Sequence, residues 1–316
     1  MGTRQTESVR RGLNRRELLA LLIGAGIGIT TGRLTAQPVS DDLILRAIPR
    51  SGERIPAVGL GSSDTFEVGA SAAERAPVSA VLKRYIGLGG RVIDTSPMYG
   101  TAETVIGDVA HQLGVDAKLW LATKVWMRGR EAGIEQMEQS FRRLRTDRID
   151  LMQVHNLIDT QTHLRTLRDW KEQGRIRYIG VTHYQVDAYD ELARLLRDET
   201  LDFVQFNYSI ATREAERMLL PQAAERRTAV LINRAYEDGR LFARVRGKPL
   251  PDWAAEFDCV SWGQFFLKYV ISHDAVTCVI PATGKVRHLV DNMGAGRGRL
   301  PDAAMRARMV AYFDSL

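Results

Sequence analysis

The stretch that decides the fold reads Arg91-Val92-Ile93-Asp94-Thr95-Ser96-Pro97-Met98-Tyr99-Gly100. Val92 and Ile93 form a short apolar run of β-branched residues, which predicts a buried strand. Pro97 and Gly100 are turn residues, so the strand ends before them. Asp94 and Tyr99 therefore leave the same strand end, close enough to share a site.

Two later strands end in a similar way. The apolar run of residues 120–124 stops on Lys124, and that of residues 149–155 stops on His155. If these strands are neighbours in one parallel sheet, their carboxyl ends meet at one edge. A carboxylate, a phenol, an ammonium and an imidazole then lie together, and this set of groups is suited to proton transfer.

This arrangement resembles the aldo-keto reductase family, whose catalytic residues are Asp, Tyr, Lys and His in this order. The family pattern G-x-x-x-D-T-A-x-x-Y-G matches Gly90 to Gly100, with Ser96 where the family usually has Ala. The resemblance extends from about Ile55 to Asn292. It implies a catalytic set of Asp94, Tyr99, Lys124 and His155.

The resemblance also implies a role for each of these groups. Tyr99 would donate a proton to the carbonyl oxygen, although a free phenol with a pKa of about 10 is a reluctant donor. Lys124 would lower the pKa of Tyr99 toward the working pH, and Asp94 would hold Lys124 in place. His155 would hydrogen-bond the carbonyl oxygen and orient it.

The rest of the chain predicts an α/β fold, a (β/α)8 TIM barrel in a single domain of residues 37–316. Short apolar strands alternate with longer amphipathic stretches, and the length suits a barrel of about 250 residues. An open doubly wound sheet is the alternative. The segment 237–258 is rich in Gly and Pro and predicts an insertion loop. The expected strands are 57–61, one around Ile93, 119–124, 149–155, 178–181, 203–206, 230–232 and 277–280, and the expected helices are 78–88, 101–113, 134–144, 162–172, 185–197, 214–226, 262–272 and one starting at 288.

Cofactor residues are implied mainly by the resemblance. Arg234 stands where the family places a flat group against the nicotinamide ring, and pairing with Glu237 is the alternative reading. Residues 280–292 resemble the loop that grips the adenosine 2′-phosphate, with Ala282 and His288 at the family's usual Lys and Arg. Lys285 and Arg287 could supply the charge instead, so NADPH is expected and NADH stays open. The expected cofactor-binding residues are Gly61, Ser62, Thr182, His183, Gln205, Arg234, Thr283, Lys285, His288 and Asn292.

The first 36 residues have the pattern of an export signal. A basic start is followed by an uncharged apolar run from Leu18 to Thr31, shorter than the roughly 20 residues that span a bilayer. Residues 14–19 resemble the twin-arginine export motif, with the pair at Arg15 and Arg16. We expect cleavage near Ala36 and export to the periplasm through the twin-arginine machinery. Ordinary secretion, or an uncleaved signal that tethers the chain to the membrane, is the alternative.

Charge and cysteine content exclude other classes of protein. Residues 1–36 carry six Arg and two Glu, a net +4, so the remainder of the +6 chain has 6 − 4 = +2. That balance, without a basic patch interleaved with aromatic residues, argues against nucleic-acid binding. Cys259 and Cys278 are the only cysteines, and we expect two free thiols rather than a disulfide. Neither belongs to a metal-ligand pattern, so no metal site is expected.

Taken together, the sequence predicts an exported NADPH-dependent oxidoreductase that reduces an aldehyde or ketone, with Tyr99 as general acid. The substrate is a small-molecule carbonyl compound of undetermined identity. The alternative is a non-catalytic nicotinamide-binding or redox-sensing protein on the same barrel. A third interpretation is that the chain is a membrane-tethered partner subunit, which would require that the signal is not cleaved. The oligomeric state has no signature in the sequence.

Overall fold

A computed structural model of the chain describes Gly2 and residues 42–316. The expected signal of residues 1–36, its twin arginines and its cleavage site lie outside these described residues. The described residues 42–316 belong to one compact unit. All elements discussed below belong to it.

Eight parallel strands form the closed barrel that the sequence predicts. Each strand pairs with the next in chain order from β3 to β10. The first and last strands also meet, through parallel bridges Val58–Val279 and Gly61–Ala282, so an open sheet is excluded. Gly61 allows this approach, because a Cβ there would lie 2.7 Å from the Ile280 carbonyl oxygen. The strands are β3 Leu60–Gly61, β4 Val92–Asp94, β5 Trp120–Val125, β6 Ile149–His155, β7 Ile176–Thr182, β8 Phe203–Asn207, β9 Ala229–Asn233 and β10 Cys278–Val279.

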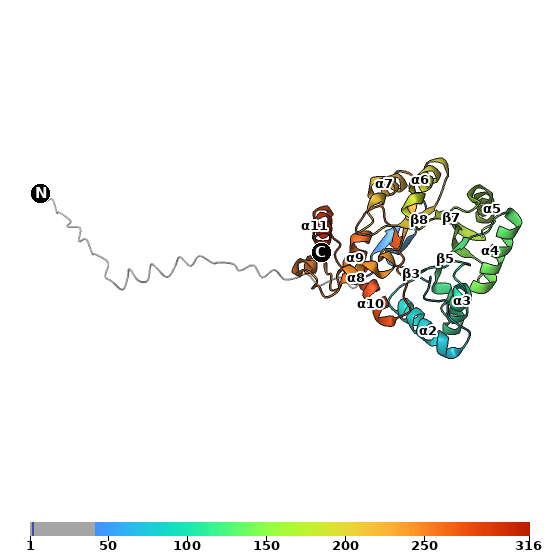
Figure 1. Cartoon of the computed structure of the whole chain (residues 1–316), viewed down its shortest axis with the longest axis horizontal. Helices are drawn as coiled ribbons and strands as arrows, with labels where there is room; N and C mark the ends of the chain where they lie inside the picture. Colours follow the sequence, from blue (N-terminus) through green and yellow to red (C-terminus); the bar gives the residue numbers. More distant parts are fainter. Residues whose placement is uncertain (1, 3–41) are drawn as a thin grey trace. The chain divides into compact units, whose positions relative to one another are not determined.

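Helices surround the strands, as the ring from α2 to α7 in Figure 1 shows. Buried apolar side chains of these helices belong to the larger core cluster, together with side chains of the barrel strands. None of the helices in residues 42–316 has both the length and the hydropathy that crossing a bilayer requires. The helices are α2 Ala72–Gly87, α3 Ala102–Leu113, α4 Arg130–Leu144, α5 Thr160–Glu172, α6 Tyr189–Asp198, α7 Leu219–Glu225, α8 Arg240–Arg244, α9 Trp262–Ile271, α10 Val286–Ala295 and α11 Ala303–Asp314.

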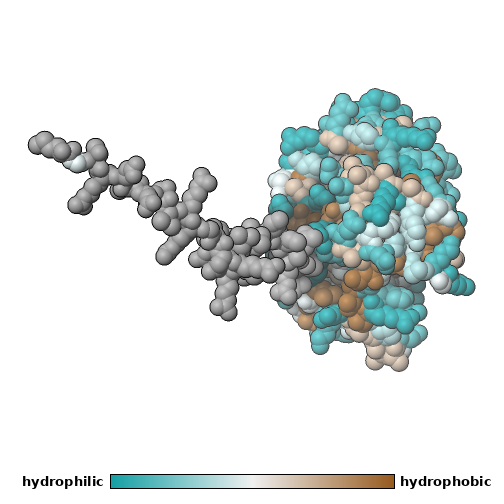
Figure 2. Space-filling view, turned by 90° about the vertical axis from the view of Figure 1, so that its left-hand side faces the viewer, coloured by the Kyte–Doolittle hydropathy of each residue, from teal (hydrophilic) through white to brown (hydrophobic). Residues whose placement is uncertain are grey.

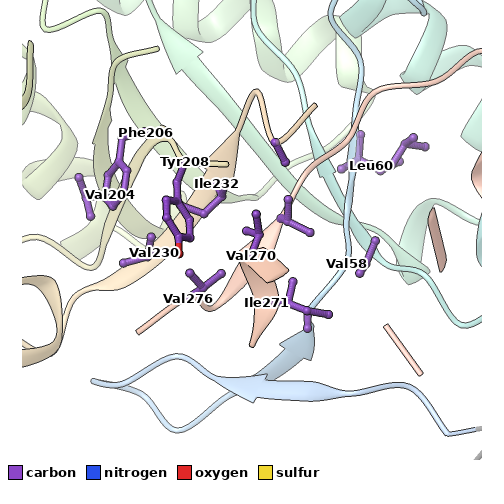
Figure 3. Close-up of a cluster of buried hydrophobic side chains, with 14 of the residues drawn as sticks. Val58, Leu60, Val204, Phe206, Tyr208, Val230, Ile232, Val270, Ile271 and Val276 are labelled. Carbon is purple, nitrogen blue, oxygen red and sulfur yellow. The ribbon is translucent and has the colours of Figure 1, made fainter. Parts of the chain in front are cut away.

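The apolar core has two parts, which are separated by the barrel wall. The larger part lies between strands and helices, and Figure 3 shows a section of it where side chains of β9 and α9 lie together. The smaller part fills the inside of the barrel and contains an aromatic cluster, in which Trp120 stacks on Tyr178 and Phe203 packs at an angle against both. On the face drawn in Figure 2 the surface is mainly hydrophilic, with separate apolar patches.

A short hairpin, β1 Leu45–Ala47 and β2 Arg54–Pro56, lies at the amino-terminal end of the barrel strands. Glu53 in this hairpin accepts hydrogen bonds from Arg177 and from the Tyr178 hydroxyl at 2.6 Å. Arg177 in turn pairs with Asp150 at 2.7 Å. These contacts close one end of the barrel and leave the carboxyl ends of the strands for the site.

Several element boundaries differ from the sequence expectation. Helix α2 begins at Ala72 rather than residue 78, because Ser71 and Glu74 form a capping box ahead of Pro77. The expected helix 214–226 splits into a short 3-10 turn, Glu214–Arg217, and α7. The insertion 237–258 is not a plain loop, since it contains α8 and the 3-10 turns Glu237–Gly239 and Asp252–Phe257. The hairpin and α11 were not predicted.

The two cysteines are free thiols, as the sequence predicts. Both Cys259 and Cys278 are buried. Burial raises the pKa of Cys259 to about 11 and raises that of Cys278 further. Both thiols are therefore protonated and shielded at neutral pH.

Candidate active site

The four expected catalytic residues meet at the carboxyl end of the barrel. Asp94 is the last residue of β4, His155 is the last residue of β6, and Lys124 is the next-to-last residue of β5. Tyr99 lies in the turn after β4. Its backbone N–H donates to the Ser96 carbonyl at 3.0 Å, and Gly100 takes the positive φ of 45° that the turn requires.

Lys124 and Asp94 form a fully buried ion pair. The Lys124 ammonium donates to Asp94 Oδ1 at 2.6 Å and to the Thr95 carbonyl at 2.7 Å. The Lys124 side chain is 0% exposed and that of Asp94 is 4% exposed. Burial lowers the pKa of Lys124, but the charge of Asp94 and the contact with Tyr99 raise it more, so the net shift is upward. Lys124 is therefore a permanent cation beneath Tyr99.

Two amides, one on β6 and one on β8, hold the second oxygen of Asp94. Gln205 donates to Asp94 Oδ2 at 2.9 Å and Gln153 donates to it at 3.2 Å. Gln205 was expected at the cofactor, whereas Gln153 was not singled out. Its inward position is two residues before His155 on the same strand, which is the signal that could have found it.

Tyr99 lies between Lys124 and His155. The Lys124 ammonium is 5.0 Å from the centre of the Tyr99 ring, and the rings of Tyr99 and His155 meet edge to face with centroids 5.9 Å apart. Burial raises the pKa of Tyr99, and the opposing effect of Lys124 is smaller. The expectation of a net lowering of this pKa is wrong, because desolvation of the phenolate outweighs the attraction of the ammonium.

His155 is held as a neutral imidazole. Burial lowers its pKa to about 2, with further lowering from Lys124 and His183. Its Nδ1 lies 3.0 Å from the Ser96 hydroxyl, and its ring lines the cavity described next.

A cavity of about 870 Å³ opens over these residues, within the upper range for ligand pockets. It runs from Asp94 to the start of α10. Most of the expected cofactor residues line it, but His183 and Lys285 do not, and Lys124 lies beneath the wall. The expected site residues that line it are Gly61, Ser62, Asp94, Tyr99, His155, Thr182, Gln205, Arg234, Thr283, His288 and Asn292.

Three polar atoms on this wall are buried without a hydrogen-bond partner: Ser62 Oγ, Asn156 Oδ1 and Asn233 Oδ1. Ser62 follows β3, Asn156 follows β6, and Asn233 is the last residue of β9. Buried polar groups in proteins are normally paired, so unpaired ones around a cavity fit a polar ligand. Asn156 and Asn233 were not predicted, although each lies at a strand exit.

The amide cluster near the tetrad is already partly connected. Gln205 Oε1 accepts from the Thr182 hydroxyl at 2.9 Å and from Asn233 at 3.3 Å. The His183 ring instead stacks on Tyr184, with centroids 5.5 Å apart, and accepts the Gln185 N–H. Thr182 and Gln205 are thus fixed in the wall, whereas His183 lies behind the lining residues Tyr184 and Asn233, and its backbone carbonyl accepts from Asn233 at 3.4 Å.

Arg234 follows β9 and lines the cavity as expected, but its ion pair is different. It pairs with Asp238, not with Glu237. Glu237 accepts from Ser209 at 2.6 Å and from Arg240 at 3.0 Å. The guanidinium of Arg234 lies 5.3 Å from the centre of the Tyr184 ring. The guanidinium therefore makes a cation–π contact with another residue that lines the cavity.

The far end of the cavity is formed by the loop before α10. The Thr283 hydroxyl accepts the Lys285 N–H at 3.1 Å, and Asn292 Oδ1 accepts from the Tyr236 hydroxyl at 2.7 Å. Burial lowers the pKa of His288, and the neighbouring cations Arg287 and Lys285 lower it further. Of these three basic side chains only His288 lines the cavity, and Lys285 and Arg287 lie next to it in the chain.

Some exposed apolar side chains beyond the strand ends line the cavity and others do not. Trp126 and Met127 are exposed beyond β5 and do not line the cavity. The exposed apolar groups that do line it are Met98, Tyr184 and Phe242. Phe242 belongs to α8, inside the insertion of residues 237–258.

The sequence matches the aldo/keto reductase family over residues 57–308. This chain belongs to that family. It is 30% identical over 268 residues to the methylglyoxal reductase YeaE of Escherichia coli (strain K12), covering 82% of this chain and 91% of the relative. It is 24% identical to the L-galactose dehydrogenase of Arabidopsis thaliana, covering 79% and 87%.

Solved structures agree with this assignment. An aldo/keto reductase from Klebsiella pneumoniae in complex with NADP and acetate superimposes with a TM-score of 0.70 at 26% identity, covering 85% of this chain and 95% of the other. An aldo-keto reductase from the same organism in complex with NADPH gives 0.71 at 25% identity, covering 86% and 96%. The barrel architecture is thus shared across nearly the whole length of these proteins.

Proposed function

We propose that this chain reduces a small aldehyde or ketone to the alcohol with NADPH, and that Tyr99 is the general acid. The observation that carries the proposal is the buried Asp94–Lys124 pair beneath Tyr99, with neutral His155 beside it at one cavity. Relatives with the same fold are solved with NADP and NADPH. Family membership supplies the reaction class.

The wall of the cavity fits a dinucleotide. Unpaired oxygens of Ser62, Asn156 and Asn233 offer acceptors, and the basic end near His288 suits a phosphate. Thr182 and Gln205 would hold the carboxamide, while Thr283 and Asn292 would hold the adenosine end. When bound, the nicotinamide supplies the hydride that reaches the carbonyl carbon.

The protein's own groups then handle the proton. His155 donates a hydrogen bond to the carbonyl oxygen and orients it. Tyr99 is protonated at neutral pH, because its pKa is raised, so the acid form is always available. An alkoxide is a stronger base than a phenolate, so the proton moves from Tyr99 to the oxygen as negative charge develops. Lys124 stabilises the phenolate that remains, and the bond to Asp94 fixes the ammonium.

The test is turnover of NADPH with a carbonyl panel that includes methylglyoxal, because YeaE is named a methylglyoxal reductase. Replacement of Tyr99 by Phe should lower kcat by a factor on the order of 10² to 10⁴ and leave the affinity for NADPH unchanged. A folded Tyr99→Phe variant with full turnover would refute the acid role. Tight NADPH binding without turnover of any carbonyl would support the non-catalytic alternative.

We also propose that the chain is exported through the twin-arginine machinery. The support is the basic start, the pair Arg15 and Arg16 and the apolar run up to Thr31. Replacement of both arginines by Lys should block export and cause accumulation in the cytoplasm. Continued export of this variant would remove the twin-arginine premise. A retained apolar run in the purified exported protein, detected by its mass, would show the membrane-tethered form instead.

A further inference from the structure

Ser96 is the one residue of the turn motif that departs from the family's usual Ala, and it lies directly beside His155. Its side chain is fully buried, and its hydroxyl oxygen lies 3.0 Å from His155 Nδ1. The same oxygen accepts the backbone N–H of Met98 at 3.3 Å. The turn that carries Tyr99 therefore also places a hydroxyl against the imidazole.

The direction of the Ser96–His155 hydrogen bond follows from counting hydrogens. A serine hydroxyl has one hydrogen to donate and two lone pairs to accept with, and Met98 uses one lone pair. Within residues 42–316, no acceptor other than His155 Nδ1 contacts the Ser96 hydroxyl. A buried hydroxyl hydrogen without an acceptor is costly, so Ser96 donates to Nδ1.

The other ring nitrogen must then carry the hydrogen. A neutral imidazole has one N–H and one acceptor nitrogen, and the partner of one nitrogen selects the tautomer. His155 is neutral because burial and Lys124 lower its pKa to about 2. With Nδ1 accepting, Nε2–H is free and the ring borders the cavity. The opposite tautomer would present a lone pair to the lone pairs of a carbonyl oxygen and repel it.

We propose that Ser96 is a positioning residue that fixes His155 in the Nε2–H tautomer, so that the imidazole donates a hydrogen bond to the substrate oxygen. This proposal rests on the proposed carbonyl reduction. The donor is set before the substrate arrives, which avoids reorganisation during the reaction. Ser96 itself acts only through His155.

The direct test is the ¹⁵N spectrum of the histidine rings in the full chain at about pH 7. The chain has six histidines, and loss of one signal in a His155→Asn variant assigns the relevant ring. We expect an unprotonated Nδ1 and a protonated Nε2 in the wild-type protein. Ser96→Ala should give a mixture of tautomers, whereas Ser96→Thr, which keeps the hydroxyl, should retain the wild-type pattern.

Kinetics test the consequence. Loss of one hydrogen bond of ordinary strength corresponds to about a five- to tenfold lower kcat in Ser96→Ala, with an unchanged Kd for NADPH. Ser96→Thr should restore most of the rate. A matched control is Ser140→Ala, because Ser140 is equally buried but lies in α4, away from the site.

Three results would overturn the proposal. The first is a wild-type His155 with its hydrogen on Nδ1, which needs no variant to detect. The second is a Ser96→Ala protein with the wild-type tautomer. The third is a changed tautomer without a change in kcat. Absence of turnover in the wild-type protein would count against the proposed function alone, since the spectrum would still decide the tautomer.

Discussion

The buried Asp94–Lys124 pair allows a quantitative prediction about folding stability. Asp94→Asn keeps the shape of the side chain but removes its charge. At 2.6 Å the Coulomb attraction of the two charges is about 6 kcal/mol at an effective dielectric constant of about 20. Without Asp94, Lys124 can avoid part of this cost by becoming neutral. Deprotonating a lysine with a free pKa of about 10.4 at pH 7 costs about 1.4 kcal/mol for each pH unit between the two values. We expect a loss of about 4 kcal/mol at neutral pH, within the range for broken buried pairs.

The pH dependence of this loss has a definite sign. In the wild-type protein the pKa of Lys124 is raised, so its contribution is complete below about pH 10.4 and is lost only above that value. In Asp94→Asn the pKa of Lys124 would fall below its unfolded value. The unfolded state then binds more protons, and the stability of the variant rises with pH. The difference between the two proteins should therefore shrink between about pH 7 and pH 10.

Urea unfolding followed by circular dichroism measures this difference at several pH values. The control is Glu138→Gln, because Glu138 pairs with Arg175 at 2.8 Å while their side chains are 36% and 32% exposed. That pair should cost about 1 kcal/mol or less, with little dependence on pH. A loss below about 1 kcal/mol in Asp94→Asn, or a loss equal at pH 7 and pH 10, would refute the reasoning.

Three further predictions concern burial and packing. The free energy of unfolding of the wild-type protein should fall by up to about 1.4 kcal/mol per pH unit below about pH 6.5 through His155 alone, because the folded pKa of His155 is about 2. Urea unfolding of a His155→Gln variant should lack this part of the pH dependence. Cys259 and Cys278 should resist a thiol reagent in the native protein and react fully in urea; rapid labelling of the native protein would show that the buried state is wrong. Gly61→Ala should destabilise the barrel by about 1 to 3 kcal/mol because of the close Ile280 carbonyl, whereas Gly87→Ala, with open space around it, should be neutral or stabilising; equal thermal denaturation of the two variants would contradict this.

The meeting of the four candidate catalytic residues was predictable because each lies on a barrel strand or in the turn that follows one. Asp94, Lys124 and His155 need only the strand pattern and the parallel order to be brought together. The direction of the Tyr99 pKa shift was not predictable, since it depends on how far burial outweighs Lys124. The sequence shows which charged residues are expected near Tyr99, but the loss of solvent around the phenol can be known only from the packed structure.

The contacts of the loop residues in the site were harder to predict from the sequence. Arg234 binds Asp238 rather than Glu237 because the segment turns back through left-handed backbone at both acidic positions, with φ of 52° at Glu237 and 54° at Asp238. Non-glycine residues adopt such angles infrequently, so nothing in the sequence signals the turn. The choice of partner follows from this backbone. Substrate walls built on such segments therefore require a structure.

The two ends of the barrel have complementary roles that explain the site's electrostatics. At one end Glu53, Arg177 and Asp150 form an ion network with partly exposed side chains. Above it, the inner core with Trp120 and Phe203 occupies the barrel interior and leaves little room for water. A charge pair next to such a layer is poorly solvated from below, which makes an uncharged His155 and a tightly bound Lys124 favourable at once. The chemistry proposed at the open end thus depends on the apolar packing inside the closed end, and a smaller residue at Trp120 should weaken the site without contacting it.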